Sequence, residues 1–386
     1  MTGKTDILFV IGQMDIGGTE KHLRTLLPAL NQRGLNVCLF AIRSGGALIK
    51  PLRDDGVEVY CPKNARRGIW GVLFAASDLI RIVRNTRPAA VHFFLPEAYL
   101  LGGFCTLFTS AKKFMSRRSL NAYQKNRWYA RPLEKLLHRT LEMSFANSEP
   151  IRLQLIQEGI PENKVTVLHN GVDPFTRPEN TELDKYRADL GIRSDDIVCL
   201  VVANFIPYKG HLDVIQAFSL LNTENSHDWH LIFVGRGSEA NLSTIQAQIY
   251  ERSLGEKVSI ITNCDDPRIY LGLADIGILA SHEEGFSNAL LEYMAAELAI
   301  VATDVGGNSD AIDSGISGIL VPPRNPETIA KSVSELIESA ELRRKLASDA
   351  KRKAEEKFSL SDCIDQYFRH YVRLIEANSR QSTHNG

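Results

Sequence analysis

Residues 276–296 read IGILASHEEGFSNALLEYMAA. The first five are a short run of branched apolar residues, which is typical of a strand buried on both faces. After a turn rich in glycine and serine, residues 288–296 show the apolar spacing of an amphipathic helix. A buried strand that leads into a helix is the repeating unit of a parallel sheet covered by helices. The stretch therefore predicts an α/β fold.

The same alternation recurs along most of the chain. Buried strands are predicted at residues 6–11, 36–42, 89–94, 198–204, 230–234, 257–262 and 300–303, and helices at 19–33, 211–221, 327–357 and 362–376. A polar, proline-bearing stretch at 175–193 interrupts the pattern, and 386 residues exceed one ordinary domain. We therefore expect two Rossmann-like domains, 1–174 and 175–361, that face a central cleft. We expect helix 362–386 to cross back and complete the first.

The composition is that of a soluble globular chain, with 44% hydrophobic residues, 24% charged residues and a net charge of −1. Six cysteines are scattered without a C-x-x-C pair, which suits a reducing compartment and argues against a zinc site. No signal peptide is recognised, and polar residues near its start leave the apolar segment 89–111 too short to span a membrane. We expect a cytoplasmic protein.

The turn at 281–287 has the features of a ligand site. Glycine and serine at a strand exit let the backbone approach a ligand, and the following helix start presents N–H groups suited to a phosphate. Glu284 precedes the segment GFSN at 285–288, and Glu292 lies one helical turn inside the helix. Either glutamate alone is better explained as a surface group favoured by the helix dipole. Together they predict a site at the carboxyl ends of the strands, where open α/β sheets bind ligands.

Glu284 and Glu292, with GFSNALL between them, resemble the E-x7-E signature of the retaining, nucleotide-sugar-dependent glycosyltransferases of family 4, which have the GT-B fold. Further motifs of that family follow in its order: IGGTE at 16–20, FANS at 145–148, VLHNGVD at 167–173, PYKGH at 207–211 and VGGNSD at 305–310. The resemblance implies transfer of a hexose from a nucleotide diphosphate sugar to a sugar or lipid-linked acceptor, with no cofactor. It also implies assembly of a cell-surface glycan at the inner face of the membrane.

The resemblance also implies roles for individual residues. Lys209 would contact the donor diphosphate, Glu292 the ribose hydroxyls, and Glu284 the transferred sugar beside the reacting carbon. The other donor-binding residues that it implies are Gly17, Gly18, Asn204, Phe286, Ser287, Asn288 and Ala289. As plain turn residues, the two glycines would need no ligand, and a solvated loop lysine is the simpler alternative for Lys209.

Two departures from the family pattern concern positive charge. The chain has Ala203-Asn204 where many relatives have Gly-Arg, and its segment 114–121 lacks a histidine that the family often places there. We expect Arg117 or Arg118 to supply the missing charge, and we name Arg118 as a catalytic candidate. His92, at the end of a strand, is a weaker candidate, because a core histidine explains it equally well.

A local excess of basic residues lies between residues 110 and 140. It contains Lys112, Lys113, Arg117, Arg118, Lys125, Arg127, Arg131, Lys135 and Arg139 against Glu134, with Phe114, Tyr123, Trp128 and Tyr129 interleaved. Residues 112–139 could contact an anionic membrane or a phosphate-bearing acceptor, and a solvated basic helix face is the simpler alternative. No nucleic-acid-binding motif accompanies the excess.

Other activities can be weighed by their motifs. The sequence has no Asp-x-Asp pair and no H-E-x-x-H, so we expect a metal-independent reaction. The loop that begins at Gly12 lacks the Gly-x-Gly-x-x-Gly of a nicotinamide-dependent oxidoreductase. A nucleotide-sugar epimerase and a non-catalytic sugar-nucleotide-binding partner stay open as alternatives.

Overall fold

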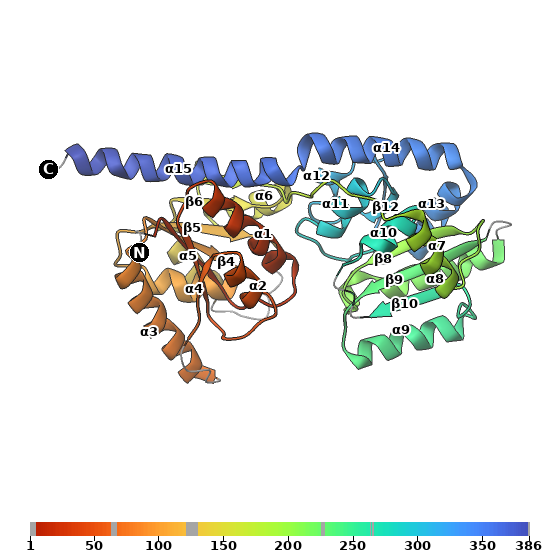
Figure 1. Cartoon of the computed structure of the whole chain (residues 1–386), viewed down its shortest axis with the longest axis horizontal. Helices are drawn as coiled ribbons and strands as arrows, with labels where there is room; N and C mark the ends of the chain where they lie inside the picture. The colour runs from red at the N-terminus through yellow and green to blue at the C-terminus, as the bar shows by residue number, and fades with distance from the viewer. Residues whose placement is uncertain are drawn as a thin grey trace. The chain divides into compact units, whose positions relative to one another are not determined.

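The computed structural model describes residues 5–62, 68–120, 130–224, 228–262, 264 and 266–384. The chain forms two compact units: unit 1 comprises Met1–Asn170 and Ser361–Gly386, and unit 2 comprises Gly171–Leu360. Each unit contains one parallel sheet with helices packed against it (Figure 1). The predicted pair of Rossmann-like sheets is confirmed.

Unit 1 is built on a seven-stranded sheet in the order β3-β2-β1-β4-β5-β6-β7. The strands are β1 (Ile7–Ile11), β2 (Val37–Ala41), β3 (Glu58–Tyr60), β4 (Ala90–Phe94), β5 (Lys112–Arg117), β6 (Met143–Ala146) and β7 (Val165–Val167). Both β2 and β4 pair with β1 in parallel, so the direction of the strand order reverses at β1 and β4. Ligands of open α/β sheets bind at the carboxyl ends of strands at such a reversal.

The helices of unit 1 include one from the far end of the chain. They are α1 (Gly18–Gln32), α2 (Ile49–Asp54), α3 (Gly68–Thr86), α4 (Pro96–Cys105), α5 (Ala130–His138), α6 (Glu149–Gln157) and α15 (Leu360–His384). Tyr367 and Tyr371 of α15 are buried in this unit, and the Tyr371 hydroxyl lies 2.5 Å from Nδ1 of His92. The side chains of Arg33 and Asp365 form an ion pair of 2.9 Å. The predicted return of the last helix to the first domain is confirmed.

Unit 2 is built on a six-stranded parallel sheet in the order β10-β9-β8-β11-β12-β13. The strands are β8 (Ile197–Val202), β9 (Trp229–Gly235), β10 (Val258–Thr262), β11 (Ile276–Leu279), β12 (Ala299–Thr303) and β13 (Ile319–Val321). The strand order reverses at β8 and β11, where Ile276 pairs with Cys199. The predicted site at 281–287 follows β11 and therefore lies at this reversal.

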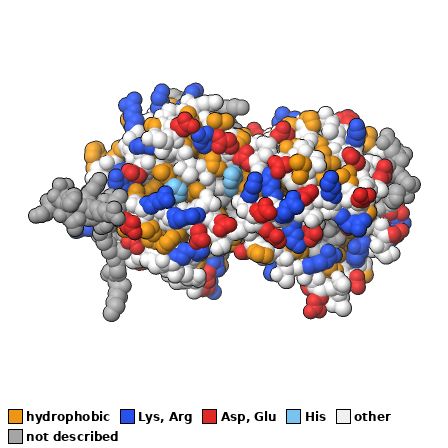
Figure 2. Space-filling model, turned by 90° about the horizontal axis from the view of Figure 1, so that it is seen from above, with side chains coloured by type: hydrophobic (Ala, Val, Ile, Leu, Met, Phe, Trp, Pro, Cys, Tyr) orange, Lys and Arg blue, Asp and Glu red, His pale blue; other side chains and the backbone are white. Residues whose placement is uncertain are grey.

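Eight helices accompany the sheet in the described part of unit 2. They are α7 (Asn180–Asp189), α8 (His211–Glu224), α9 (Glu239–Glu251), α10 (Arg268–Leu273), α11 (Asn288–Ala295), α12 (Asn308–Ala311), α13 (Pro326–Glu338) and α14 (Ala340–Lys357). The outward face of α14 carries basic and acidic side chains close together (Figure 2). Its inward face buries Leu346, Ala350 and Ala354, so α14 is an ordinary amphipathic helix that closes the core.

Two features of the strands differ from the sequence-based expectation. The strand predicted at 257–262 is not buried on both faces, because β10 is the edge strand and its residues are only partly buried. Apolar runs did not indicate β5, because its sequence KKFMSR contains three basic residues. The segment 89–111 forms β4 and the ten-residue helix α4. Within the described ranges, no helix is long and apolar enough to cross a membrane.

The basic residues between 112 and 139 do not form one exposed surface. Lys113 and Arg117 are 7% and 3% exposed, so the expectation that they contact a membrane is wrong. Both lie in β5, whose residues are buried by the neighbouring strands and helices. Lys112 forms an ion pair of 2.9 Å with Glu142. Arg131, Lys135 and Arg139 are exposed, whereas Lys125, Arg127, Tyr123, Trp128 and Tyr129 lie outside the described residues.

Candidate functional site

The predicted ligand turn of unit 2 joins the carboxyl end of β11 to α11. Ser287 is the N-cap residue of α11, and its side chain accepts a hydrogen bond of 3.4 Å from the backbone N–H of Leu290. The first turn of α11 therefore begins beside the end of β11. A helix start in this position provides the N–H groups and the positive dipole end that favour an anion.

Lys209 and Glu284 form an ion pair at this edge of the sheet. Lys209 ends a short 3-10 helix (Pro207–Lys209) that follows β8, and its Nζ lies 2.5 Å from Oε1 of Glu284. The hydroxyl of Ser281 donates to the same oxygen at 2.6 Å. The two side chains of the pair are 18% and 10% exposed, so water screens the interaction only in part. The structure thus brings together two residues that lie 75 positions apart in the sequence.

Glycine backbones approach this pair closely. A Cβ atom on Gly306, whose φ is +54°, would lie 1.9 Å from the carbonyl oxygen of Glu284. The N–H of Gly307 donates to the carbonyl oxygen of Gly285 at 2.9 Å. The loop behind the ligand turn can therefore pack against it only because residue 306 has no side chain. Sequence reasoning identified this loop but not the contact that requires the glycine.

The other predicted donor residues of unit 2 lie around the same edge. Asn204 is exposed just after β8, Asn288 and Ala289 are partly buried in the first turn of α11, and Glu292 is partly buried in its second. Phe286 is buried and packs against Phe358 at a ring distance of 5.4 Å, so its ring belongs to the core rather than to an open surface.

Two residues that sequence reasoning did not single out hold this edge together. The hydroxyl of Tyr293 accepts a hydrogen bond of 2.6 Å from the N–H of Val202, which ties α11 to the end of β8. His211 begins α8, and its burial together with the nearby charge of Lys209 lowers the pKa of its imidazole to about 4. His211 is therefore neutral at physiological pH and does not add a second positive charge beside Lys209.

In unit 1, the predicted glycines Gly17 and Gly18 lie at the start of α1, just beyond β1. Gly17 is the N-cap residue, and a Cβ atom there would lie 2.3 Å from Oε2 of Glu20. Glu20 is only 9% exposed. Burial raises the pKa of its carboxyl group, and the charge of Asp15 raises it further, whereas Arg118 lowers it. A buried carboxyl group beside this glycine turn was not predicted from the sequence.

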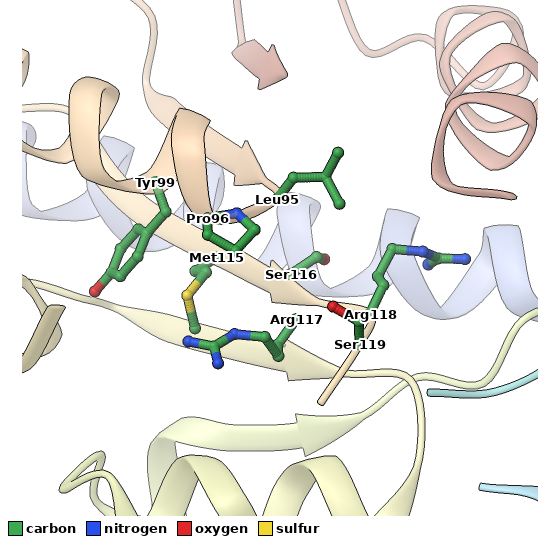
Figure 3. Close-up of a pocket in the computed structure, with 8 residues that line it drawn as sticks. All are labelled: Leu95, Pro96, Tyr99, Met115, Ser116, Arg117, Arg118 and Ser119. Carbon is green, nitrogen blue, oxygen red and sulfur yellow. The ribbon is translucent and has the colours of Figure 1, made fainter. Parts of the chain in front are cut away.

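The two arginines at the end of β5 point in opposite directions (Figure 3), as successive residues of a strand do. Nη2 of Arg117 lies 3.1 Å from Glu134 and 3.3 Å from Glu158. Nη2 of Arg118 donates to Oδ1 of Asn170 at 2.6 Å, and its Nη1 is buried with no hydrogen-bond partner among the described residues. Arg118 is therefore the arginine of this pair that can bind a further group.

His92 is a core histidine. It is fully buried, with Nδ1 2.5 Å from the Tyr371 hydroxyl and Nε2 2.9 Å from the Ser116 hydroxyl. Burial, helped by the charge of Arg118, holds the pKa of its imidazole well below the usual range. Nδ1 thus contacts α15 and Nε2 contacts β5, so both ring nitrogens are used inside the core and the alternative of a structural histidine is the better supported one.

The end of β4 carries backbone strain. Leu95 has φ +70° and ψ 152°, a backbone conformation that residues other than glycine rarely adopt. It lines a small pocket together with Pro96, Tyr99, Met115, Ser116, Arg117, Arg118 and Ser119 (Figure 3). Strained residues are concentrated at functional sites, and Leu95 stands where the strand order of unit 1 reverses.

One group of potential metal ligands lies among the described residues. Glu134, His138 and Glu158 are buried and offer ligand atoms within 4.8 Å of one another. The guanidinium of Arg117 already lies against both carboxylates, and Nδ1 of His138 is 2.7 Å from the Tyr99 hydroxyl. We interpret the group as a buried ion network in which Arg117 is the cation.

Comparison with known proteins identifies the family. Residues 16–174 match the family model "Glycosyltransferase Family 4", and residues 183–353 match the model "Glycosyl transferases group 1". The two matches follow one another along most of the chain. The chain belongs to glycosyltransferase family 4. It is therefore an enzyme that transfers a sugar from a nucleotide-sugar donor with retention of configuration, on the GT-B fold.

Two of the relatives are distant in sequence but match over most of their length. The capsular polysaccharide biosynthesis glycosyltransferase CapM of Staphylococcus aureus is 23% identical over 85% of this chain and 87% of that protein. The N-acetylgalactosamine-N,N'-diacetylbacillosaminyl-diphospho-undecaprenol 4-alpha-N-acetylgalactosaminyltransferase of Campylobacter jejuni is 28% identical over 88% and 92%. Several other relatives match over about half of their own length.

Solved structures show the same fold. HepE of Anabaena in complex with UDP superposes with a TM-score of 0.85, at 18% identity, over 96% of this chain and 100% of that one. At this identity the likeness establishes the fold of the chain. It does not identify the substrate.

Proposed function

We propose that this glycosyltransferase moves a hexose from a nucleoside diphosphate sugar to a hydroxyl group of a lipid-linked glycan, without a metal ion. The donor would bind at the carboxyl edge of the unit 2 sheet. Lys209 would contact the diphosphate, Glu292 the ribose hydroxyls and Glu284 the hydroxyls of the transferred sugar. Asn204 and the backbone of Ser287, Asn288 and Ala289 would complete the donor site, beside the buried ring of Phe286.

The observation that carries the donor proposal is the Lys209–Glu284 pair beside the first turn of α11. The leaving diphosphate gains negative charge as its bond to the sugar breaks, so a partly buried ammonium and a helix start stabilise the transition state. A donor bound beside the pair would bring its sugar hydroxyls to Glu284 and its phosphates to Lys209. The ion pair therefore positions each group for the part of the donor that it would bind.

The reaction itself needs few protein groups. The bond between the anomeric carbon and the phosphate oxygen breaks, and the acceptor oxygen forms its bond on the same face of the sugar. The acceptor proton passes to the departing phosphate oxygen, which balances the step without a protein nucleophile. Catalysis then consists of positioning and of charge stabilisation. Gly17 and Gly18 would present the backbone of unit 1 to the diphosphate.

The acceptor proposal rests on unit 1 and on relatives. The Campylobacter jejuni relative is named for a diphospho-undecaprenol-linked acceptor, and CapM for capsular polysaccharide biosynthesis. Arg118 has a buried nitrogen without a hydrogen-bond partner among the described residues, which suits an acceptor phosphate or the donor diphosphate. We therefore place the enzyme in cell-surface glycan assembly, in the cytoplasm and peripherally at the inner face of the membrane.

Thermal stabilisation by ligands tests the donor site directly. Purified protein is heated with a panel of nucleoside diphosphates and nucleotide sugars in the presence of EDTA, because ligand binding to the folded state raises the midpoint. We expect one nucleoside diphosphate to stabilise the wild type and Glu283→Ala, whose side chain is exposed, but not Glu292→Ala. No stabilisation by any nucleotide, or stabilisation by NAD alone, would contradict the donor site.

Product analysis then separates transfer from the alternatives. The stabilising donor is incubated with and without a diphosphate-linked lipid acceptor, and both the donor and the lipid product are quantified. Transfer predicts lipid product with loss of donor only when the acceptor is present. Conversion of the donor without acceptor would instead indicate an epimerase, and binding without any turnover would indicate a non-catalytic partner.

A further inference from the structure

Exposed apolar side chains are concentrated in one part of unit 1. Half of the large apolar side chains that are exposed in the described chain belong to α3, to the end of α4 and to the turn that follows α4. They are Ile69, Trp70, Val72, Leu73, Phe104 and Phe108, of which Trp70 is 62% and Phe108 100% exposed. The remaining exposed apolar side chains are spread over several elements, and single side chains of that kind need no explanation.

The helix α3 buries one face and exposes another of unusual composition. Ala75, Leu79 and Val83 are buried in unit 1. Trp70, Leu73, Ser77, Arg81 and Arg84 follow at helical spacing on the exposed side. The first two turns of this exposed face are therefore apolar and its later turns are basic.

The charges on α3 are one-sided. Its only acidic residue is Asp78, which is 8% exposed and forms an ion pair with Arg81. The side chain of Arg81 is still 50% exposed, and Arg84 is exposed as well. The exposed face of α3 thus presents positive charge without an exposed carboxylate of its own.

The end of α4 and the turn after it each add one aromatic ring to this surface. The thiol of Cys105 lies 3.9 Å from the carbonyl oxygen of Ala76, which places the end of α4 against the middle of α3. The two helices lie side by side in unit 1 (Figure 1). Phe104 and Phe108 flank Cys105 and are exposed. We call these six apolar residues together with Arg81 and Arg84 the α3 surface.

We propose that the α3 surface docks on a lipid bilayer that contains anionic phospholipids. Aromatic and aliphatic side chains beside arginines are the composition of helices that lie in a membrane interface, where apolar groups enter the acyl boundary and basic groups contact phosphates. This inference rests on the proposed lipid-linked acceptor, because an enzyme with such a substrate works at a bilayer. It replaces the basic segment 112–139, two of whose residues are buried, as the site of membrane contact.

A bilayer fits the α3 surface better than a second copy of the chain does. In a two-fold dimer each copy presents the same surface. Asp78 already pairs with Arg81, so Arg84 of both copies would enter one interface without an α3 carboxylate left to neutralise it. Anionic headgroups provide that neutralisation along the whole helix. The charge pattern therefore selects the lipid as the occupant.

Vesicle binding tests the proposal with the full chain. Wild-type protein is sedimented with vesicles of phosphatidylcholine alone and with vesicles containing one-third phosphatidylglycerol. We expect binding to the anionic vesicles that weakens with salt. Trp70→Ser/Leu73→Ser should lower the partition coefficient at least tenfold, because each buried apolar side chain contributes about tenfold or more to membrane affinity. Arg84→Gln should lower binding to the anionic vesicles about fivefold and should not change binding to the phosphatidylcholine vesicles.

The matched control is Tyr250→Ser, which removes an 85% exposed aromatic side chain from α9 in unit 2. It should bind vesicles as the wild type does. All variants are at exposed positions, so their thermal midpoints should equal that of the wild type. Equal vesicle binding by Trp70→Ser/Leu73→Ser and wild type would overturn the proposal. So would a wild-type dimer that this double variant converts to a monomer while the wild type binds no vesicles.

Nucleotide binding keeps this test separate from the proposed function. Trp70→Ser/Leu73→Ser should retain the thermal stabilisation by the donor nucleotide, because the substituted residues lie outside the donor site. Loss of vesicle binding with intact nucleotide binding supports the α3 surface. Vesicle binding by a protein that no nucleotide stabilises would support the α3 surface and contradict the donor site instead.

Discussion

The carboxyl edges of the two sheets, at the points where the strand order reverses, differ in how their charged side chains are paired. In unit 2, where the strand order reverses at β8 and β11, Lys209 pairs with Glu284 and Gly306 packs against the same residue. In unit 1, where it reverses at β1 and β4, Arg118 keeps a nitrogen without a partner in the described chain. The backbone of Leu95 is strained there as well. The lysine of one edge is neutralised internally, whereas the arginine of the other keeps a nitrogen without a partner beside a strained residue.

This difference indicates different roles for the two edges. A lysine that is already held by a carboxylate is preorganised. A diphosphate can replace the carboxylate as its partner with little rearrangement of the site. An edge with a buried, unpaired guanidinium nitrogen gains most from a ligand that supplies the missing acceptor. We infer that the edge of unit 2 is preformed for the donor and that the edge of unit 1 is stabilised when substrate binds.

The largest effect is expected from the lysine of unit 2. Lys209→Ala should lower kcat/KM about a thousandfold, because it removes the charge that stabilises the leaving diphosphate. Initial rates at several donor concentrations measure this, and Lys331→Ala, an exposed lysine of α13, is the matched control. A loss of less than tenfold would mean that the edge of unit 2 does not neutralise the diphosphate.

The next effect is on stability and comes from the close backbone contact. Gly306→Ala should lower the free energy of unfolding by about 3 kcal/mol, since its Cβ would collide with the Glu284 carbonyl and its φ is positive. Gly315→Ala measures the cost of a positive φ without a collision, because Gly315 has φ +80° and no atom within 4 Å of an added Cβ. That control should lose about 1 kcal/mol. Denaturant titration measures both, and equal losses would show that the loop yields to the methyl group.

A smaller, selective effect is expected from unit 1. Arg118→Gln should lower kcat/KM for the acceptor about thirtyfold, because a charge-assisted contact to a phosphate contributes about 2 kcal/mol. Stabilisation by the free donor nucleotide should be unchanged in the variant. Steady-state kinetics with varied acceptor, beside the thermal assay, separates the two. Loss of nucleotide binding in Arg118→Gln would assign the arginine to the donor instead.

The smallest effect concerns pH. Burial lowers the pKa of His211 to about 4 in the folded state, below its unfolded value, so between these values only the unfolded chain binds the proton. Its contribution to stability is present above the unfolded pKa and is lost as pH falls toward the folded pKa. From pH 7 to 5.5 the loss should be about 1 kcal/mol.

Denaturant titrations at the two pH values, compared between wild type and His211→Gln, measure this contribution. Burial also lowers the pKa values of His22 and His92 in unit 1 and of His230 in unit 2, so part of the pH dependence should persist in His211→Gln. An unchanged pH dependence in the variant would assign all of it to the other buried histidines.

The sequence predicted unit 2 better than unit 1 for a physical reason. The ligand turn, the glycine loop and the lysine turn are each contiguous and follow strands with clear apolar runs. In unit 1, apolar runs did not indicate β5, because this strand buries the basic residues Lys113 and Arg117. Glu134 and Glu158 neutralise Arg117. Composition alone cannot distinguish a buried, paired arginine from a solvated one.

The choice between the candidate groups of unit 1 also needed three-dimensional information. Strand alternation places Arg117 and Arg118 on opposite faces, but only the contacts show that Arg117 is the one already paired. The burial of Glu20 and the strained backbone of Leu95 are visible only in the folded chain. No local pattern in the sequence reports them.

The return of α15 to unit 1 has a consequence for the synthesis of the protein. Tyr367 and Tyr371 complete the aromatic core around His92 and Phe145, yet the ribosome adds them after every residue of unit 2. The nascent first unit therefore waits with an open apolar surface while the second unit emerges and can close its own core. In the living cell, the half of the enzyme that is translated first is the half that finishes folding last, and a chaperone that shields nascent chains would act mainly on it.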